Sequence, residues 1–199
     1  MRSYPRVFIA AGERSGDQFG ATLAEALRAR DPDVRLTGLG GPRMAAAGVH
    51  LIGDTVSHAG MGFFYTLLRF GHWASLFRRS VAEFHREAPD VLVPVDNPGF
   101  NLRLAAHARR RRIPVCYYVS PQVWAWRPRC IRRIGRCVDR MMTLFSFEKP
   151  LYDAIGVDCR CVGHPLLDYM PARQAAPGFL SALASTETVG LLPSSRDQE

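Results

Sequence analysis

Short apolar runs alternate with helical patterns along this chain, and this alternation constrains the fold more than any other feature. The run VLVPV, at Val91–Val95, is apolar without a break, as expected of a strand that is buried on both faces of a sheet. Strands that alternate with helices favour a parallel sheet in an α/β domain. We therefore expect strands at Val7–Ala11, Val34–Gly38, Val91–Asp96, Val115–Ser120, Met142–Phe147, Cys159–Gly163 and Val189–Pro193.

Helices are expected between these strands. Their predicted ranges are Asp17–Arg30, Tyr65–Glu87, Leu102–Arg112, Pro128–Arg136 and Lys149–Ile155. Parallel sheets of this kind bind ligands at the carboxyl ends of their strands. A functional site is therefore expected in the loops that follow the strands, which read GERSGD, DNPGFN, SPQVWAWRPR, SFEKP and GHPLLD.

The loop GERSGD joins the first strand to the first helix and places Glu13 between Gly12 and Gly16. The glycines suggest a dinucleotide-binding fingerprint, but their spacing is not G-x-G-x-x-G. A carboxylate is also an unfavourable neighbour for a pyrophosphate. We therefore expect Glu13 to lie on the rim of an active site.

The loop DNPGFN follows the central strand and begins with Asp96. An aspartate at the carboxyl end of a strand can accept a proton or orient a hydroxyl group. Asn97-Pro98 predicts a turn directly after it. The structural alternative for this loop is a helix N-cap, and Asn101, which precedes LRLAAHARRRR, fits that role better than Asp96 does.

The 199-residue chain has a formal net charge of +8, which comes almost wholly from arginine because Lys149 is the only lysine. Arginine favours contact with phosphate and carboxylate groups. Eleven arginines and a single acid, Asp139, lie between Leu102 and Arg140. Nucleic acid, anionic lipid or a phosphorylated small molecule would each satisfy this charge. No nucleic-acid-binding module is recognisable, so that class is the least favoured.

The segment from Met61 to Phe77 is unusually apolar for a helix, because its large side chains cover more than one helical face. Arg69 and His72 interrupt it, so it does not read as a spanning helix. Such a helix is buried, forms a dimer contact or lies in a membrane interface. The neighbouring Arg78 and Arg79 favour an interfacial helix on an anionic membrane.

The cysteines do not form a C-x-x-C pair, and their number is odd, so neither a disulfide framework nor a zinc site is indicated. No cleavable signal is recognised before Val7. A cytoplasmic protein with free thiols is the plain interpretation. After Pro171 the sequence leads into a further strand pattern, VGLLPSSR. We expect one domain over residues 1–171, followed over residues 172–199 by a linker and the truncated start of a second domain.

Several ordered segments together resemble lipid-A-disaccharide synthase: AGERSGD, GLGGPRMAAAG, AGMGF, DNPGFN, YYVSPQVWAWRPRCIRRIGRCVDRM, FEKPLYDAIGVDCRCVGHP and LLPSSRDQE. The resemblance covers the chain but only about the first half of that family's length. It implies the N-terminal, Rossmann-like domain of a GT-B glycosyltransferase. The implied reaction is inverting transfer of diacylglucosamine from its UDP derivative to the 6-hydroxyl of diacylglucosamine 1-phosphate, without a metal or other cofactor, at the inner face of the bacterial inner membrane.

The resemblance also implies roles for particular residues. Asp96 aligns with the family's candidate base and Glu13 with its active-site acid. Arg196 aligns with the arginine of a loop near the donor. The acceptor-binding residues it implies are Ser15, Asn101, Trp124 and Arg127. The residues expected to meet an anionic membrane are Phe64, Leu68, Trp73, Arg78 and Arg79.

The chain departs from the family pattern at a few positions. Arg14 fills a position that is usually small, Gly99 replaces an acid, Tyr65 replaces a glutamate and Ser194 replaces a glycine. These departures bear on the identity of the acceptor more than on the fold. A different class of function also fits the sequence, namely a binding module that holds an acylated phosphosugar or a membrane and transfers nothing.

Overall fold

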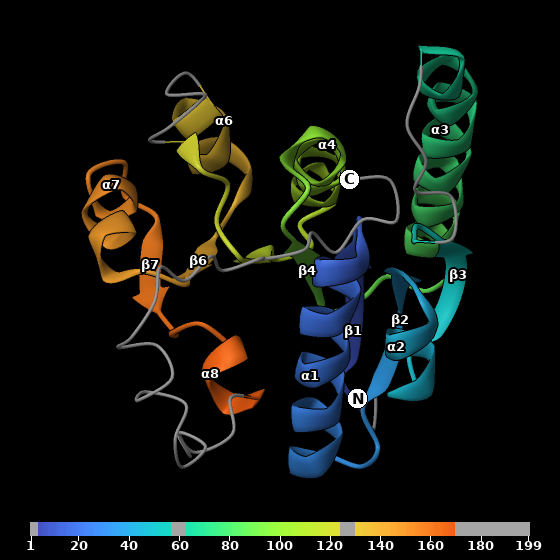
Figure 1. The fold of residues 1–199 in the computed structure, drawn as a ribbon, viewed down its shortest axis with the longest axis horizontal. Coiled ribbons are helices and arrows are strands. Elements are labelled where there is room, and N and C mark those ends of the chain that lie inside the picture. The colour runs from blue at the N-terminus through green and yellow to red at the C-terminus, as the bar shows by residue number, and fades with distance from the viewer. Residues whose placement is uncertain (1–3, 57–62, 124–129, 170–199) are drawn as a thin grey trace, which may run out of the picture. The chain divides into compact units, whose positions relative to one another are not determined.

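The computed structural model describes residues 4–56, 63–123 and 130–169, and within these ranges the chain forms a seven-stranded parallel sheet. The strand order is β3-β2-β1-β4-β5-β6-β7 (Figure 1). The strands are β1 (Arg6–Ala11), β2 (Arg35–Gly40), β3 (His50–Asp54), β4 (Val91–Val95), β5 (Cys116–Tyr118), β6 (Arg140–Thr143) and β7 (Asp158–Cys161).

The α/β fold class predicted from the sequence is confirmed. Each predicted strand in the described ranges has a counterpart, although the strand expected at Met142–Phe147 begins at Arg140 and ends at Thr143. The strand β3 was not predicted, because HLIGD is short, contains a glycine and lies at the edge of the sheet. The strand expected at Val189–Pro193 lies outside the described residues.

Helices connect the strands, and their bounds agree broadly with the predicted ranges. They are α1 (Arg14–Arg30), α2 (Pro42–Ala46), α3 (Phe63–Arg86), α4 (Pro98–Arg110), α6 (Cys130–Cys137), α7 (Lys149–Asp153) and α8 (Leu166–Tyr169), with a short 3-10 helix, η1 (Ser146–Glu148). The prediction that Asn101 caps a helix was wrong. Helix α4 begins four residues earlier than predicted, with Pro98 in its first turn and Asn97 at the N-cap.

The chain reverses its direction of travel across the sheet between β1 and β4. From β1 it moves outward through α1, β2, α2 and β3, and α3 then carries it back so that β4 pairs with the free side of β1. Figure 1 shows α1 and α2 on one side of the sheet and α3, α4 and α6 on the other. The topological switch point, where such sheets bind ligands, therefore lies at the carboxyl ends of β1 and β4.

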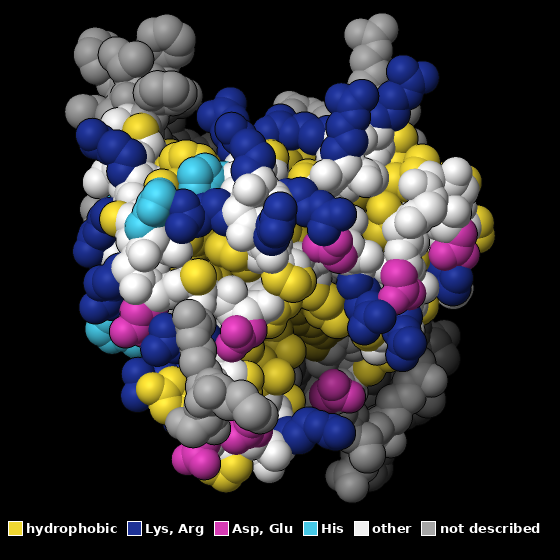
Figure 2. Space-filling model, turned by 180° about the vertical axis from the view of Figure 1, so that it is seen from behind, with side chains coloured by type: hydrophobic (Ala, Val, Ile, Leu, Met, Phe, Trp, Pro, Cys, Tyr) yellow, Lys and Arg dark blue, Asp and Glu magenta, His cyan; other side chains and the backbone are white. Residues whose placement is uncertain are grey.

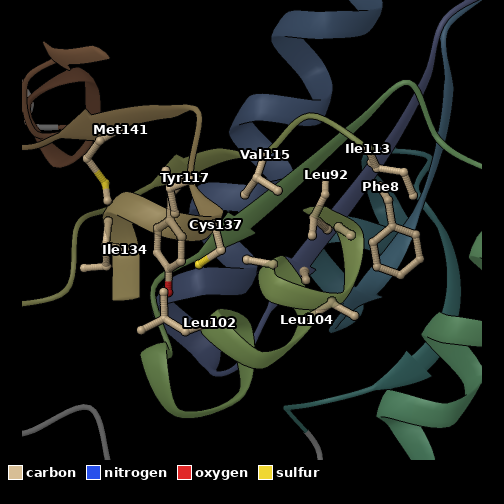
Figure 3. Close-up of a cluster of buried hydrophobic side chains, with 14 of the residues drawn as sticks. Phe8, Leu92, Leu102, Leu104, Ile113, Val115, Tyr117, Ile134, Cys137 and Met141 are labelled. Carbon is tan, nitrogen blue, oxygen red and sulfur yellow. The ribbon is translucent and has the colours of Figure 1, made fainter. Parts of the chain in front are cut away.

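Each face of the sheet has its own hydrophobic cluster. Along β1, Phe8 and Ala10 belong to one cluster, whereas Val7, Ile9 and Ala11 belong to the other, as the alternation of side chains along a strand requires. The first cluster lies beneath α3, α4 and α6, and part of it is drawn in Figure 3. Both faces of the central strands are therefore buried, which explains why VLVPV has no polar residue.

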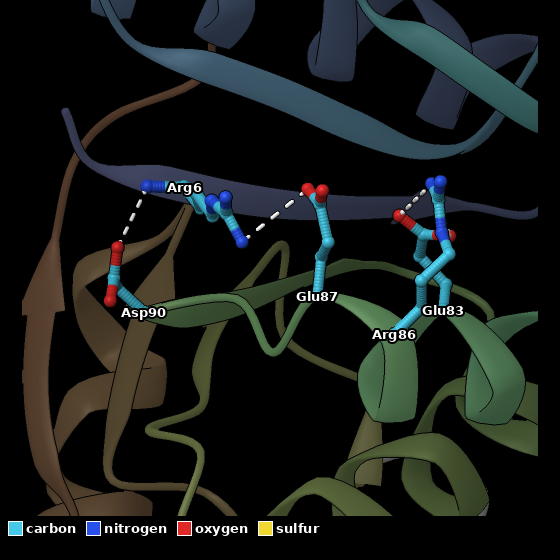
Figure 4. A network of polar contacts seen from close by, with 5 residues as sticks. All are labelled: Arg6, Glu83, Arg86, Glu87 and Asp90. Carbon is cyan, nitrogen blue, oxygen red and sulfur yellow. Dashed lines mark hydrogen bonds and ion pairs between the residues drawn. The ribbon is translucent and has the colours of Figure 1, made fainter. Parts of the chain in front are cut away.

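Charged side chains hold the amino ends of β1 and β4 together (Figure 4). The Arg6 amide donates to Asp90 at 2.8 Å, and the Arg6 guanidinium lies 3.4 Å from Glu87. On the last turn of α3, Arg86 pairs with Glu83 at 2.9 Å. The two contacts of Arg6 join segments that are distant in sequence at the amino edge of the sheet.

The chain divides into two compact units, residues 1–164 and residues 165–199. The sheet belongs to the first unit, and α8 belongs to the second. The sequence placed the boundary a few residues later, between 171 and 172, and the roles of the two parts stay a prediction. None of the helices in the described ranges combines the length and the hydropathy that a membrane-spanning segment needs.

Candidate active site

Two acidic loops leave the sheet next to each other at the switch point. Ala11, the last residue of β1, is paired with Val95, the last residue of β4. The following loops touch, because a Cβ atom added to Gly12 would lie only 2.0 Å from the Asn97 Nδ2 atom. The backbone of one loop can approach the other only where residue 12 has no side chain. The loops that carry Glu13 and Asp96 therefore leave the sheet at one rim, as we expected from the sequence.

The turn after β4 has an unusual backbone. Asp96 and Asn97 have φ angles of +47° and +44°, in the left-handed region that L-residues seldom adopt. Val119, directly after β5, has a φ of +62°, which is rarer still for a β-branched side chain. Such strain persists only where the surroundings enforce it, and it often accompanies function. These three residues lie at the carboxyl ends of β4 and β5, whereas Arg112, with a φ of +59°, follows the end of α4.

Burial raises the pKa of the half-buried Asp96 carboxyl above its ordinary value, and the negative charge of Glu13 raises it further. A hydrogen bond from the Asn97 backbone opposes this rise. Glu13 is the more exposed of the two acids and accepts a hydrogen bond of 3.1 Å from the Ser15 hydroxyl. The two carboxyl groups therefore occupy different environments, as an acid–base pair with unequal roles requires.

Asn101 lies beneath the strained turn rather than on the rim. Its side chain is 0% exposed. The amide nitrogen lies 3.0 Å from the Ala10 carbonyl oxygen, 3.1 Å from that of Val95 and 2.8 Å from that of Asp96. Asn101 therefore ties together the ends of the two strands that carry the acidic loops.

Asp17, in the first turns of α1, was not singled out in the sequence. It is 2% exposed, and its carboxylate accepts hydrogen bonds from the backbone amides of Gly41, Arg43 and Met44 at 2.7, 3.1 and 3.0 Å. These amides form the N-terminus of α2, where a negative charge is favourable. The signal in the sequence was the segment GGPRM, which starts a helix without a capping side chain of its own.

A second buried carboxylate supports the loop after β5. Glu148 is 3% exposed and accepts a hydrogen bond of 2.5 Å from the Ser120 hydroxyl and one of 3.2 Å from the Phe145 amide. The Tyr152 hydroxyl donates to the Pro121 carbonyl oxygen at 3.2 Å, and burial raises the pKa of Tyr152 to about 12. The start of the segment SPQVWAWRPR is thereby fixed to η1 and α7.

Several predicted site residues fall outside what the structure describes. Trp124, Arg127 and Arg196 lie outside the described residues, and the side chains of Phe64 and Leu68 are outside them as well, although both residues belong to α3.

The remaining predicted membrane residues have different surroundings. The ring of Trp73 is half-buried and lies against Phe100 with the ring centroids 4.9 Å apart, and Arg78 and Arg79 are exposed.

The arginines at the end of α4 lie far from the acidic rim. Arg109 pairs with Asp139, whose carboxylate also accepts a hydrogen bond of 2.9 Å from the Val115 amide, just before β5. The run of arginines at residues 109–112 therefore belongs to the amino edge of the sheet. Figure 2 shows Lys and Arg side chains gathered over the upper part of that view, where α3, α4 and α6 lie. These arginines cannot meet a phosphate bound beside Asp96.

An apolar hollow of about 430 Å³ also opens toward the amino edge, next to α1. Val7, Leu27 and Val91 are among its lining residues, and Figure 2 shows a hydrophobic hollow below the centre of the view. Its acid, Asp139, is already bonded to Arg109 and to the Val115 amide. The hollow therefore lacks an available proton acceptor, and the carboxyl edge is the better candidate for chemistry. Over the described ranges, no cluster of His, Cys, Asp or Glu side chains could hold a metal ion.

Solved structures with a similar fold include an epimerase and a glycosyltransferase. A UDP-N-acetylglucosamine 2-epimerase from Rickettsia bellii matches 92% of this chain and 49% of its own, with a TM-score of 0.57 and 14% identity. The glycotransferase of kitacinnamycin matches 88% of this chain and 53% of its own, with a TM-score of 0.53 and 17% identity. At these identities the likeness establishes the fold alone, namely the Rossmann-like sheet of a GT-B domain.

Relatives found by sequence share a much higher identity with this chain. The lipid-A-disaccharide synthases of Myxococcus xanthus and Geobacter sulfurreducens are 41% and 43% identical to this chain over 98% of its length. The chain spans 52% and 51% of those proteins, about half the length of the curated relatives it matches. The family model described as lipid-A-disaccharide synthetase matches residues 7–199. The chain therefore belongs to the lipid-A-disaccharide synthase family.

Proposed function

We propose that this chain is the acceptor-side half of an inverting glycosyltransferase of lipid A biosynthesis. It acts in the transfer of diacylglucosamine from its UDP derivative to the 6-hydroxyl of diacylglucosamine 1-phosphate. The observation that carries this proposal is the pair of acids, Glu13 and Asp96, at the switch point of the sheet. The substrates come from family membership, because the chain spans only about half of its relatives.

Asp96 is the general base in this proposal. It takes the proton of the acceptor 6-hydroxyl as the oxygen attacks the anomeric carbon of the donor, and UDP leaves from the opposite face of the sugar with inversion. A base whose pKa is raised toward the working pH transfers protons more effectively than an ordinary carboxylate. Glu13, on the exposed side of the rim beside Ser15, orients the acceptor hydroxyl.

The leaving diphosphate needs cationic or amide donors to stabilise its charge. We assign that role to Arg196 on the donor side, and we assign acceptor contacts to Trp124 and Arg127. Helix α3 is proposed to lie on the anionic inner surface of the bacterial inner membrane, where the exposed Arg78 and Arg79 meet lipid phosphates. Acylated substrates would then reach the rim without leaving the membrane.

The base assignment is tested by the rate of disaccharide formation. The protein is expressed from the complete reading frame that contains this chain, and Asp96→Asn is compared with Glu13→Gln. Asp96→Asn should lower kcat by roughly 10²- to 10⁴-fold and leave donor binding nearly unchanged. A smaller loss of kcat is expected for Glu13→Gln. If Glu13→Gln lost more kcat than Asp96→Asn, Glu13 would be the base and Asp96 the residue that orients the acceptor.

The alternative function, a binding module without transferase activity, is tested with the same protein in a binding measurement and a disaccharide assay. Binding of acylated glucosamine 1-phosphate by the wild type, without any disaccharide formed from the UDP-linked donor, would establish the module and overturn the enzyme.

The membrane proposal is tested by sedimentation with vesicles that contain anionic phospholipid. Phe64→Ser and Leu68→Ser together should reduce sedimentation of this chain. Trp73 is left unchanged, because its ring packs on Phe100 and its loss would disturb the core. Phe147→Ser is the control, because it removes an apolar side chain that is 54% exposed on η1, outside α3. Equal sedimentation of all variants would contradict the proposal.

A further inference from the structure

Two tyrosines in the first hydrophobic cluster donate their hydroxyl groups to backbone carbonyls. Tyr117, on β5, and Tyr152, on α7, are each 0% exposed. Tyr152 bonds to Pro121, in the loop after β5. The Tyr117 hydroxyl lies 2.6 Å from the carbonyl oxygen of Asp96, the residue proposed as the base. Figure 3 shows the Tyr117 ring among Leu102, Ile134 and Cys137, with its oxygen directed away from β5.

The backbone of Asp96 is held from several directions. Its amide donates to the Tyr118 carbonyl at 3.1 Å, while its carbonyl accepts from the Tyr117 hydroxyl and, at 2.8 Å, from the Asn101 amide. These bonds fix both peptide groups that flank the Asp96 side chain. They hold a residue in the left-handed region, which is unfavourable for a side chain other than glycine.

We propose that Tyr117 is a positioning residue of the candidate active site, whose buried hydroxyl holds the Asp96 carbonyl and thereby fixes the direction of the Asp96 carboxyl group. The proposal rests on the proposed function, because it gives Tyr117 a purpose only if Asp96 acts on substrate. At 0% exposure Tyr117 cannot touch the substrate itself, so it acts entirely through Asp96.

Removal of the hydroxyl has a defined consequence. In Tyr117→Phe the ring still fills the core, but the Asp96 carbonyl keeps only its bond to Asn101, and the strained turn can relax. The Asp96 carboxyl then becomes more hydrated. Because burial is the main reason that the pKa of Asp96 is raised, this pKa should fall toward its ordinary value. Glu13, the other group that raises it, is untouched by the substitution.

Tyr152→Phe is the matched control. It removes a hydroxyl from the same hydrophobic cluster and likewise deprives a backbone carbonyl of its donor, but that carbonyl belongs to Pro121. Both variants should lose stability, since each gives up a buried hydrogen bond from a tyrosine hydroxyl to a backbone carbonyl. Only Tyr117→Phe should change the titration of Asp96.

The experiment is a carbon-detected NMR titration of the 199-residue chain with labelled aspartate, in which Asp96→Asn identifies the Asp96 carboxyl signal. Tyr117→Phe should lower the Asp96 pKa by roughly half a pH unit, about a threefold change in proton affinity, and Tyr152→Phe should leave it in place. An unchanged Asp96 pKa in Tyr117→Phe, or an equal shift in both variants, would show that Tyr117 only packs the core.

Should Tyr117→Phe fail to fold, 4-aminophenylalanine is introduced at position 117 instead. This residue keeps a ring of the same shape and a weaker donor, so a smaller fall in the Asp96 pKa is expected, and no fall would overturn the proposal. The titration requires no turnover. Its failure is therefore distinguishable from a failure of the proposed transferase function, which the kinetic assay detects separately.

Discussion

The two edges of the sheet are built from different interactions. At the carboxyl edge, buried polar side chains bond to the backbone, as Asp17 does to the start of α2 and Asn101 to the ends of β1 and β4. At the amino edge, exposed side chains pair with each other, as Arg140 does with Asp158 at 2.6 Å, where the two side chains are 52% and 48% exposed. Buried polar groups are costly to leave unpaired, whereas exposed ion pairs contribute little. The carboxyl edge should therefore tolerate far fewer substitutions.

The largest loss of stability is expected at the contact between the two acidic loops. Gly12→Ala places a Cβ atom 2.6 Å from the Asn97 Cβ, a clash that the backbone must move to relieve. We expect a loss of more than about 3 kcal/mol in the free energy of unfolding, measured by urea denaturation. Gly99→Ala is the control, because its nearest neighbour lies 3.9 Å away in an open part of α4. It should fall within about 1 kcal/mol of the wild type, on the stabilising side.

A smaller loss is expected when the cap of α2 is weakened. Asp17→Asn replaces one carboxylate oxygen with a donor that faces the backbone amide of Arg43. The free energy of unfolding should fall by about 2 kcal/mol, as expected for a lost hydrogen bond to a charged group. In the control, Asp153→Asn, an exposed pair with Lys149 is broken, and the loss should stay below about 1 kcal/mol. Equal losses would remove the distinction between buried and exposed acids.

Substitution of Asp96 should raise the free energy of unfolding at pH 7, whereas the substitutions of Gly12 and Asp17 lower it. Its folded pKa is raised above the unfolded value of about 3.9, so the folded chain binds this proton more tightly and stability falls as the pH rises through that interval. Asp96→Asn cannot ionise. It should therefore be more stable than the wild type at pH 7, and this advantage should shrink as the pH is lowered below the unfolded pKa. Urea denaturation of both proteins at pH 7 and at a pH below the unfolded pKa measures this difference in stability. A wild type that is more stable than Asp96→Asn at pH 7 would contradict a raised pKa for Asp96.

The smallest effect is expected at the amino edge. A double-mutant cycle with Arg140→Gln and Asp158→Asn should give a coupling energy below about 1 kcal/mol, and added salt should reduce it further. A coupling energy as large as the loss in Asp17→Asn would show that both edges depend equally on their charged groups.

The sequence predicted the central strands and the position of the acids well, because both depend on local pattern. A strand buried on both faces is apolar throughout, and an acid directly after such a strand must lie at its carboxyl end. Pairing of β1 with β4 then brings Glu13 and Asp96 together. The family resemblance, now supported by relatives at 41% and 43% identity, rested on the same loops.

Features that depend on contacts between distant segments could not be predicted. Helix α2 is only five residues long and is capped by Asp17 from a different helix, so the segment GGPRM marks where the helix starts but not which residue caps it. Asn101 reads as an N-cap, but the left-handed Asn97 lets α4 begin at Pro98 and moves Asn101 beneath the turn. Tyr117 reads as one apolar residue of a buried strand, and its bond to Asp96 depends on how β4 and β5 pair.

The place of β1 in the middle of the sheet has a consequence for how the chain is made. One side of β1 can pair with β2 early, but its other side waits for β4, and the bond between Arg6 and Asp90 spans 84 residues. At typical rates of synthesis, this separation corresponds to about 4 to 17 seconds of translation. During that interval an apolar strand edge stays unpaired on the nascent chain. Slow elongation between β3 and β4 should therefore favour aggregation of this protein, and rapid elongation there should favour soluble yield.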